Sequence, residues 1–191
     1  MPHSSENTRT FIRQYWNFFE TLEDDFIETE RYVSLDEDNF DTFSIEYNRL
    51  YQSVCSEIDV VAKYLCELLG DSKANNIVQY CATITTHCGK FTSEAVAVKQ
   101  LITITPWDKW AVIGKSQSDN PEWWTLYNKV KHNRQSLCTD SNSKWNNKPY
   151  HKCATQKNVL LSLAGLYILE FYCLLLICKH DCDASDDEAN S

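Results

Sequence analysis

The chain has 191 residues, of which 43 % are hydrophobic and 24 % charged, which is typical of one globular domain with a hydrophobic core. Only four Gly and four Pro argue against a turn-rich all-β sandwich and favour long helices. The net charge of −9 is unevenly distributed, because acidic residues dominate 1–60 and 181–191 whereas basic residues dominate 61–180.

The uneven charge has two explanations that the composition leaves open. Acidic helices can pair with basic ones inside a single bundle, which is the explanation we favour at this stage. Alternatively, the basic middle of the chain forms a positive surface of its own.

The chain contains nine cysteines, an odd number, and several of them lie in apolar runs where Cys behaves as a small hydrophobic residue. The first residues show no charged segment followed by an apolar one, the pattern of a secretory signal. We therefore expect free thiols and a cytoplasmic location rather than a disulfide scaffold.

Helices are predicted for most of the N-terminal half. Residues 10–33 carry apolar side chains at helical period with acidic residues opposite. Residues 38–69 carry a second apolar face, and Gly70 follows this run as a helix stop. A third helix is predicted over 73–87. The apolar positions of the first two helices are Phe11, Tyr15, Phe18, Phe19, Leu22, Phe26, Ile27, Phe43, Tyr47, Leu50, Val54, Ile58, Val61, Leu65 and Leu68.

The middle of the chain departs from helical period. Residues 91–105 show partial alternation of apolar and polar side chains, which predicts a short β-hairpin or an extended arm. Residues 106–110, with two tryptophans, are expected to form an aromatic elbow. Residues 114–120 are predicted to be a polar loop.

A short helix with an unusual composition is predicted over 121–134. Pro121 suits its first turn and Glu122 complements the helix dipole. Trp124, Asn128 and His132 fall on one stripe of this helix, at positions i, i+4 and i+8. The indole can anchor the helix while the amide and the imidazole are presented at the mouth of a groove.

The C-terminal part is predicted to hold an exposed connection, a long helix and a tail. Residues 136–152 are polar, and so long a connection is often functional. The helix should span 154–180, and the acidic residues 181–191 are expected to be disordered.

The last helix is apolar on all sides from 159 to 178 apart from Ser162, Gly165 and Glu170. Such a segment is long enough to cross a bilayer, so a tail-anchored membrane protein is one hypothesis. A carboxylate near its middle opposes insertion, and we favour a buried core helix, making a membrane partner the weaker alternative. Glu170 then needs a partner, a neutral state or a place at a rim.

Motifs for metal and cofactor binding are weak. Cys178, His180 and Cys182 lie close together, as do His151 and Cys153, but neither group has the paired spacing of a zinc module. Phosphate-binding glycine loops and the serine hydrolase elbow do not occur in the sequence. We expect no metal and no cofactor.

The residues near the end of the predicted helix 121–134 offer acid–base chemistry. Histidine side chains can act as general acids or bases near neutral pH, which makes His132 a candidate, and the amide of Asn128 lies one turn before it. Lys129, Lys131 and Arg134 can hold phosphate groups, so metal-free cleavage of RNA is chemically feasible here. The alternative is that these side chains form the solvated face of an ordinary helix.

Two carboxylates in the second helix are candidate supporting residues. Glu57 or Asp59 can orient the basic helix from across the bundle. Alternatively Asp59 forms a surface ion pair with Lys63, four residues later.

The chain resembles the HEPN superfamily of helical-bundle proteins in three places. These are the helix around residues 55–63, the run 123–134 and the apolar helix that follows. The family motif is an Arg, a polar residue and then a His a little over one turn later. Here the His position falls on His132, the polar position on Asn128 and the Arg position on Tyr127.

This resemblance implies a fold, an activity and partners. The fold is an all-α, antiparallel bundle of four to five long helices with the arm at 91–105, forming one domain over 1–180. Many family members are metal-independent ribonucleases of defence or toxin–antitoxin systems that dimerise around a shared cleft. The resemblance thus implies RNA as ligand, a homodimer, a cognate protein partner, and support from Tyr127 and Trp124.

Tyr127 in place of Arg argues against catalysis, and the family includes inactive members that bind RNA, nucleotides or proteins. Three hypotheses follow: an RNA-binding or RNA-cleaving protein, a non-catalytic helical scaffold, and a membrane-tethered helical protein.

Overall fold

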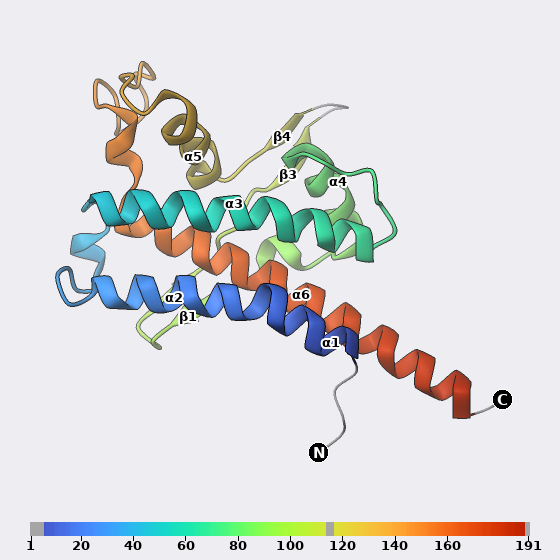
Figure 1. Ribbon diagram of the computed structural model, residues 1–191. Coiled ribbons are helices and arrows are strands. Elements are labelled where there is room, and N and C mark those ends of the chain that lie inside the picture. The colour runs from blue at the N-terminus through green and yellow to red at the C-terminus, as the bar shows by residue number, and fades with distance from the viewer. Residues whose placement is uncertain (1–5, 114–116, 190–191) are drawn as a thin grey trace.

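Three long helical segments form the body of the protein in the computed structural model, which describes residues 6–113 and 117–189 (Figure 1). The chain is mostly helical with two small antiparallel sheets, as the sequence predicted for the helices. The long helical elements are α1 (Glu6–Phe11), a π-helical segment (Ile12–Trp16), α2 (Asn17–Thr29), α3 (Ile45–Leu68) and α6 (Gln156–Ala189).

The first helical run is continuous but not uniform. Between α1 and α2 the backbone widens into the π-helical segment, where the N–H of Asn17 reaches the carbonyl of Ile12. Of the predicted apolar positions in this run, Phe11, Phe19 and Phe26 are buried in the core. Phe18 and Ile27 are each 43 % exposed, so the prediction was wrong for these two side chains.

The central helix pair does not run as predicted. The run α1–α2 is antiparallel to α6, but α3 and α6, the most extensive helix pair, run parallel (Figure 1). Their first turns lie together, where the amide of Gln156 donates to the Tyr47 hydroxyl at 3.2 Å. Two helices that follow each other in a chain can run parallel only if the connection between them returns to the end where the first helix began. Residues 69–155 form that connection.

Polar caps set where the middle helices begin. Ser44 accepts a hydrogen bond from the N–H of Tyr47 and starts α3 later than the predicted residue 38, after a single 3-10 turn over Glu37–Asn39. Gly70, with φ of 92°, ends this segment as predicted. The third predicted helix is confirmed as α4 (Ile77–His87), capped by Asn76.

Two hairpins connect α4 to α5. The predicted hairpin is confirmed as β1 (Val96–Val98) paired with β2 (Ile102–Ile104). A second hairpin, β3 (Ala111–Ile113) with β4 (Gln117–Asp119), stands where a polar loop was predicted over 114–120. That prediction was wrong for 117–119 because Gln-Ser-Asp has no β-type pattern, and 114–116 lie outside the described residues.

Tryptophans join the short helix α5 (Glu122–Asn133) to α6. The predicted aromatic elbow is buried, and the Trp107 indole donates to the carbonyl of Gly165 at 3.0 Å. The Trp123 indole donates to the carbonyl of Pro106 at 2.7 Å. The elbow is therefore held to two helices by indole hydrogen bonds.

Gly165 lets these indoles approach α6, because a Cβ there would lie 3.3 Å from atoms of both Trp107 and Trp123. We expect Gly165→Val to lower the free energy of unfolding by about 1–3 kcal/mol through overpacking, measured by urea denaturation. The control is Gly89→Val, since nothing lies within 4 Å of a Cβ at Gly89. Equal effects of the two substitutions would contradict the role given to Gly165.

The last helix extends beyond its predicted end. The prediction of a disordered tail over 181–191 is corrected for its described part, because α6 continues to Ala189. Asp181 accepts hydrogen bonds from Asn7 at 3.0 Å and Thr8 at 3.1 Å, which ties this part of α6 to α1. Adding turns to an existing helix needs no new nucleation.

Most of the apolar window of α6 is buried inside the protein, although the helix is long and apolar enough to cross a membrane. Val159, Leu166, Leu169 and Cys173 are fully buried. Glu170 is also fully buried, and neither of its carboxyl oxygens has a hydrogen-bond partner among the described residues.

Candidate functional site

Helix α5 has one face in the core and one in solvent. Pro121 precedes its first residue, and the N–H of Trp124 donates to the Pro121 carbonyl at 3.0 Å. The inner face consists of Trp123, Trp124, Leu126, Tyr127 and Val130, which are buried. The outer face exposes Lys129, Lys131 and His132. The sequence therefore placed the helix and its anchoring indoles correctly.

The predicted stripe does not form a shared cleft. Trp124 is 5 % exposed, and the Asn128 amide donates to the carbonyl of Trp124 in its own helix at 3.1 Å. His132 is exposed at the end of the helix and borders none of the five main cavities of the described chain. Within one chain, Asn128 and His132 are thus not presented to a common ligand space.

Tyr127 is a core residue. Its ring is 4 % exposed and packs edge-on against Tyr51 with 6.0 Å between ring centres, while the Lys131 ammonium lies 5.6 Å from the Tyr127 ring centre. Burial raises the pKa of the Tyr127 hydroxyl. An Arg at this position would need its charge buried beside aromatic rings, which is unfavourable without a partner.

Neither candidate carboxylate of α3 forms an ion pair with a described residue of α5. Glu57 is half-buried on the side of α3 that faces Glu170 of α6, and burial raises its pKa. Asp59 lies beside Tyr80 of α4, where burial and then Asp59 raise the pKa of that hydroxyl to about 12. No Asp59–Lys63 ion pair occurs among the described salt bridges.

A basic surface covers α5 and the connection that follows it. Residues 122–157 contain seven Lys and Arg but only two Asp and Glu. Of those seven cations only Lys144 forms an ion pair with a described residue, at 2.7 Å from Asp41. The favoured explanation of the charge pattern was that acidic helices pair with basic ones. These seven cations form fewer ion pairs with described acidic residues than that explanation predicts. We call Lys129, Lys131, Arg134, Lys144, Lys148 and Lys152 the basic face.

Several cations of the basic face lie over aromatic rings. The ammonium groups of Lys144 and Lys148 lie 4.8 and 5.4 Å from the ring centre of Trp145, and that of Lys152 lies 5.4 Å from Phe43. Such contacts hold a cation in place without neutralising it. The positive charges of Lys148 and Lys152 thus stay available to an anionic ligand, whereas that of Lys144 is paired with Asp41.

The connection 136–152 folds against α5 and completes a pocket. The N–H of His151 donates to the carbonyl of Arg134 at 3.0 Å, which joins the end of the connection to the end of α5. Figure 1 shows α5 and this connection together at one end of the molecule. They border a pocket of about 680 Å³ against the first turns of α3, which we call the α3–α5 pocket. Its other walls include Phe43, Asn48, Arg49 and Gln52.

The groups of the α3–α5 pocket differ in their freedom to bind a ligand. Arg49 is already paired with Glu46 and Asp25, whereas Arg134 is exposed and forms no ion pair with a described residue. His151 places its ring edge-on to Phe43, with 6.1 Å between ring centres, and its buried Nδ1 has no described partner. Phe43 is 44 % exposed.

Sequence reasoning found Arg134 but missed His151, Phe43 and Asn48 as pocket residues. The only signal was the length of the polar connection that contains His151. Phe43 and Asn48 looked like ordinary positions of a helix, and only the fold brings them to Arg134.

Metal-binding groups do not form in the described part of the chain, where no three His, Cys, Asp or Glu side chains meet in a suitable cluster. The described cysteines from Cys55 to Cys178 are free thiols.

Comparison with models of protein families, with curated proteins and with solved structures gave no match to this chain. The HEPN resemblance and the homodimer that it implies therefore stay predictions from three segments of the sequence.

Proposed function

We propose that this protein binds single-stranded RNA through the basic face and the α3–α5 pocket, and does not cleave it. The observation that carries the proposal is the position of Arg134. Its guanidinium has no described ion-pair partner and borders a pocket that also contains an exposed aromatic ring and three side-chain amides.

These groups match the chemistry of an unpaired RNA strand. Arg134 and the lysines of the basic face can contact successive phosphates, which supplies affinity without sequence preference. The exposed ring of Phe43 offers a surface on which a base can stack. The Gln52 amide nitrogen donates to the side-chain oxygen of Asn48, which leaves the Asn48 amide nitrogen and the Gln52 amide oxygen to hydrogen-bond to base edges. A double helix would not present its bases to such a pocket.

Binding without cleavage is favoured by the state of the motif residues. The amide of Asn128 is used within its own helix, and the Arg position is filled by the buried Tyr127. The exposed imidazole of His132 borders none of the five main cavities of the described chain, so it shares no ligand space with the Asn128 amide.

We expect Arg134→Ala to weaken binding of a fluorescent single-stranded RNA about ten-fold, because it removes a phosphate contact, as measured by fluorescence anisotropy at several salt concentrations. The slope of log affinity against log salt should fall by about 0.7 for that one lost contact. Lys63→Ala is the matched control, since Lys63 is exposed on α3 and outside the basic face.

The same assay separates the hypotheses. Absence of RNA binding at low salt, or equal effects of Arg134→Ala and Lys63→Ala, would contradict the proposal. RNA cleavage in the presence of a metal chelator, lost in His132→Ala, would show that the motif is catalytic despite Tyr127.

A further inference from the structure

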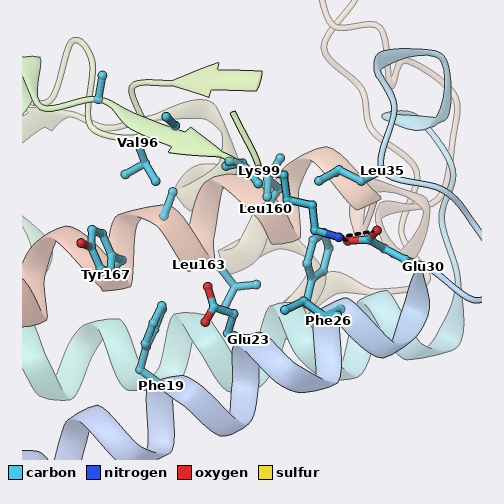
Figure 2. A pocket seen from close by; sticks show the side chains of 15 residues that line it. Phe19, Glu23, Phe26, Glu30, Leu35, Val96, Lys99, Leu160, Leu163 and Tyr167 are labelled. Carbon is cyan, nitrogen blue, oxygen red and sulfur yellow. Dashed lines mark hydrogen bonds and ion pairs between the residues drawn. The ribbon is translucent and has the colours of Figure 1, made fainter. Parts of the chain in front are cut away.

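A second cavity lies between α2, α6 and the β1–β2 hairpin, and it shares no wall residue with the α3–α5 pocket. Its volume is about 390 Å³, within the range of roughly 300–1,000 Å³ common for small-molecule sites. Figure 2 shows the hairpin above the cavity and α2 below it, with α6 behind. We call it the hairpin cavity.

The walls of the hairpin cavity are mostly apolar. Phe19 and Phe26 of α2, together with Leu160, Leu163 and Ala164 of α6, form the buried floor and sides. Val96 and Val98 cover it from the inward face of β1. An apolar group placed here would be removed from water, which favours binding in proportion to the apolar area buried.

One carboxylate in these walls is unpaired. Figure 2 shows Glu23 extending from α2 between Phe19 and Phe26 toward α6. Glu23 forms no salt bridge with a described residue, and it remains accessible to solvent. Burial, followed by the charges of Asp24 and Glu20, raises the pKa of its carboxyl group, so a nearby cation would stabilise the ionised form.

The other carboxylate of the cavity is already neutralised. Lys99 reaches from the hairpin to both carboxyl oxygens of Glu30 at 2.7 Å (Figure 2). Lys99 and Gln100 have φ of 48° and 59°, in the left-handed region that Gly or Asn normally occupies in such a turn. The turn thus keeps an unfavourable backbone conformation, and the ion pair between Lys99 and Glu30 connects the hairpin to the end of α2.

We propose that the hairpin cavity binds a small apolar molecule that carries one protonated amine, with the ammonium group on Glu23 and the apolar part against Phe26 and Leu163. The rings of Phe19 and Tyr167, which pack with 5.8 Å between their centres, add surfaces that attract a cation. The unpaired Glu23 carboxylate selects against anionic ligands of the same shape. This inference does not depend on RNA binding.

Isothermal titration calorimetry of the unaltered protein with three probes that share one alkyl chain length tests the proposal. The probes are decylamine, decanol and decanoate. Decylamine should bind about ten-fold more tightly than decanol, as expected for one partly desolvated charge pair, and decanoate should bind more weakly than both. In Glu23→Gln, decylamine and decanol should bind equally. Glu28→Gln, an exposed change on the same helix outside this cavity, should keep the ten-fold preference.

Filling the cavity provides the second test. Ala164→Leu should abolish binding of both decylamine and decanol, and Val98→Trp should do the same from the hairpin if Ala164→Leu fails to fold. Absence of saturable decylamine binding to the unaltered protein, retention of the amine preference in Glu23→Gln, or equal binding of decanoate and decylamine would each overturn the proposal.

Discussion

Replacing Glu170 with Gln is expected to stabilise the protein by about 2–3 kcal/mol at pH 7. Glu170 is fully buried, and burial, followed by the charges of Glu57 on α3 and Glu20 on α2, raises its pKa to about 8. At neutral pH the folded protein therefore keeps this carboxyl protonated, whereas the unfolded chain releases the proton above its usual pKa of about 4.5.

The pH dependence follows from that difference. Between about pH 4.5 and pH 8 the folded state binds more protons at Glu170 than the unfolded state, so the contribution of Glu170 to stability falls as pH rises. The full loss is at most about 5 kcal/mol, since each pKa unit is worth about 1.4 kcal/mol. Above pH 8 no further change is expected from this group.

Urea denaturation of the unaltered protein and Glu170→Gln at half-unit steps of pH measures this effect. The stability difference between the two proteins should be small near pH 4.5, grow up to about pH 8 and then stay constant. Glu67→Gln, an exposed change on α3, serves as control and should show no such trend. A difference that is the same at every pH would contradict a neutral Glu170 in the folded state.

Trp123→Ala is expected to destabilise the protein by about 3–5 kcal/mol, the usual cost of removing a buried indole. Trp123 is 2 % exposed and lies edge-on to Trp107 and Trp124, with 5.1 and 5.9 Å between ring centres. The substitution also leaves the Pro106 carbonyl without the hydrogen bond that the indole donates.

Denaturation of two further variants separates packing from hydrogen bonding. Trp123→Phe keeps a ring and loses only the indole donor and some volume, so a smaller loss is expected than in Trp123→Ala. Tyr32→Ala, at a side chain that is 85 % exposed, should change stability by less than about 0.5 kcal/mol. A loss below about 1 kcal/mol in Trp123→Ala would mean that the indole does not anchor α5.

The helices could be predicted because their signals are local. Apolar residues at helical period located α1–α2 and α3, a continuous apolar run located α6, and Gly70 and Pro121 marked two of the ends. The direction of α6 relative to α3 could not be predicted, since it depends on the path of the chain between them. The second hairpin was missed because its strands are only three residues long and one of them is Gln-Ser-Asp.

The candidate site was predictable only in part, for a similar reason. A helical wheel shows which side chains of α5 share a face, and it correctly separated the indoles from the cations. It does not show what opposes that face. Asn128 was expected to bind a ligand and instead bonds within its helix, whereas the pocket at Arg134 is completed by residues about 90 positions earlier in the chain.

The π-helical segment over Ile12–Trp16 has a consequence for how the chain can vary in length. A turn closed by an i to i+5 hydrogen bond holds one residue more than an α-helical turn. Deleting one exposed residue here, such as Arg13, would return the backbone to regular α-helix without rotating Phe11 away from Phe19. Elsewhere in a packed helix a deletion turns every later side chain by about 100° and exposes the core. This segment is therefore the place in the long helices where the chain can lose a residue and keep its fold.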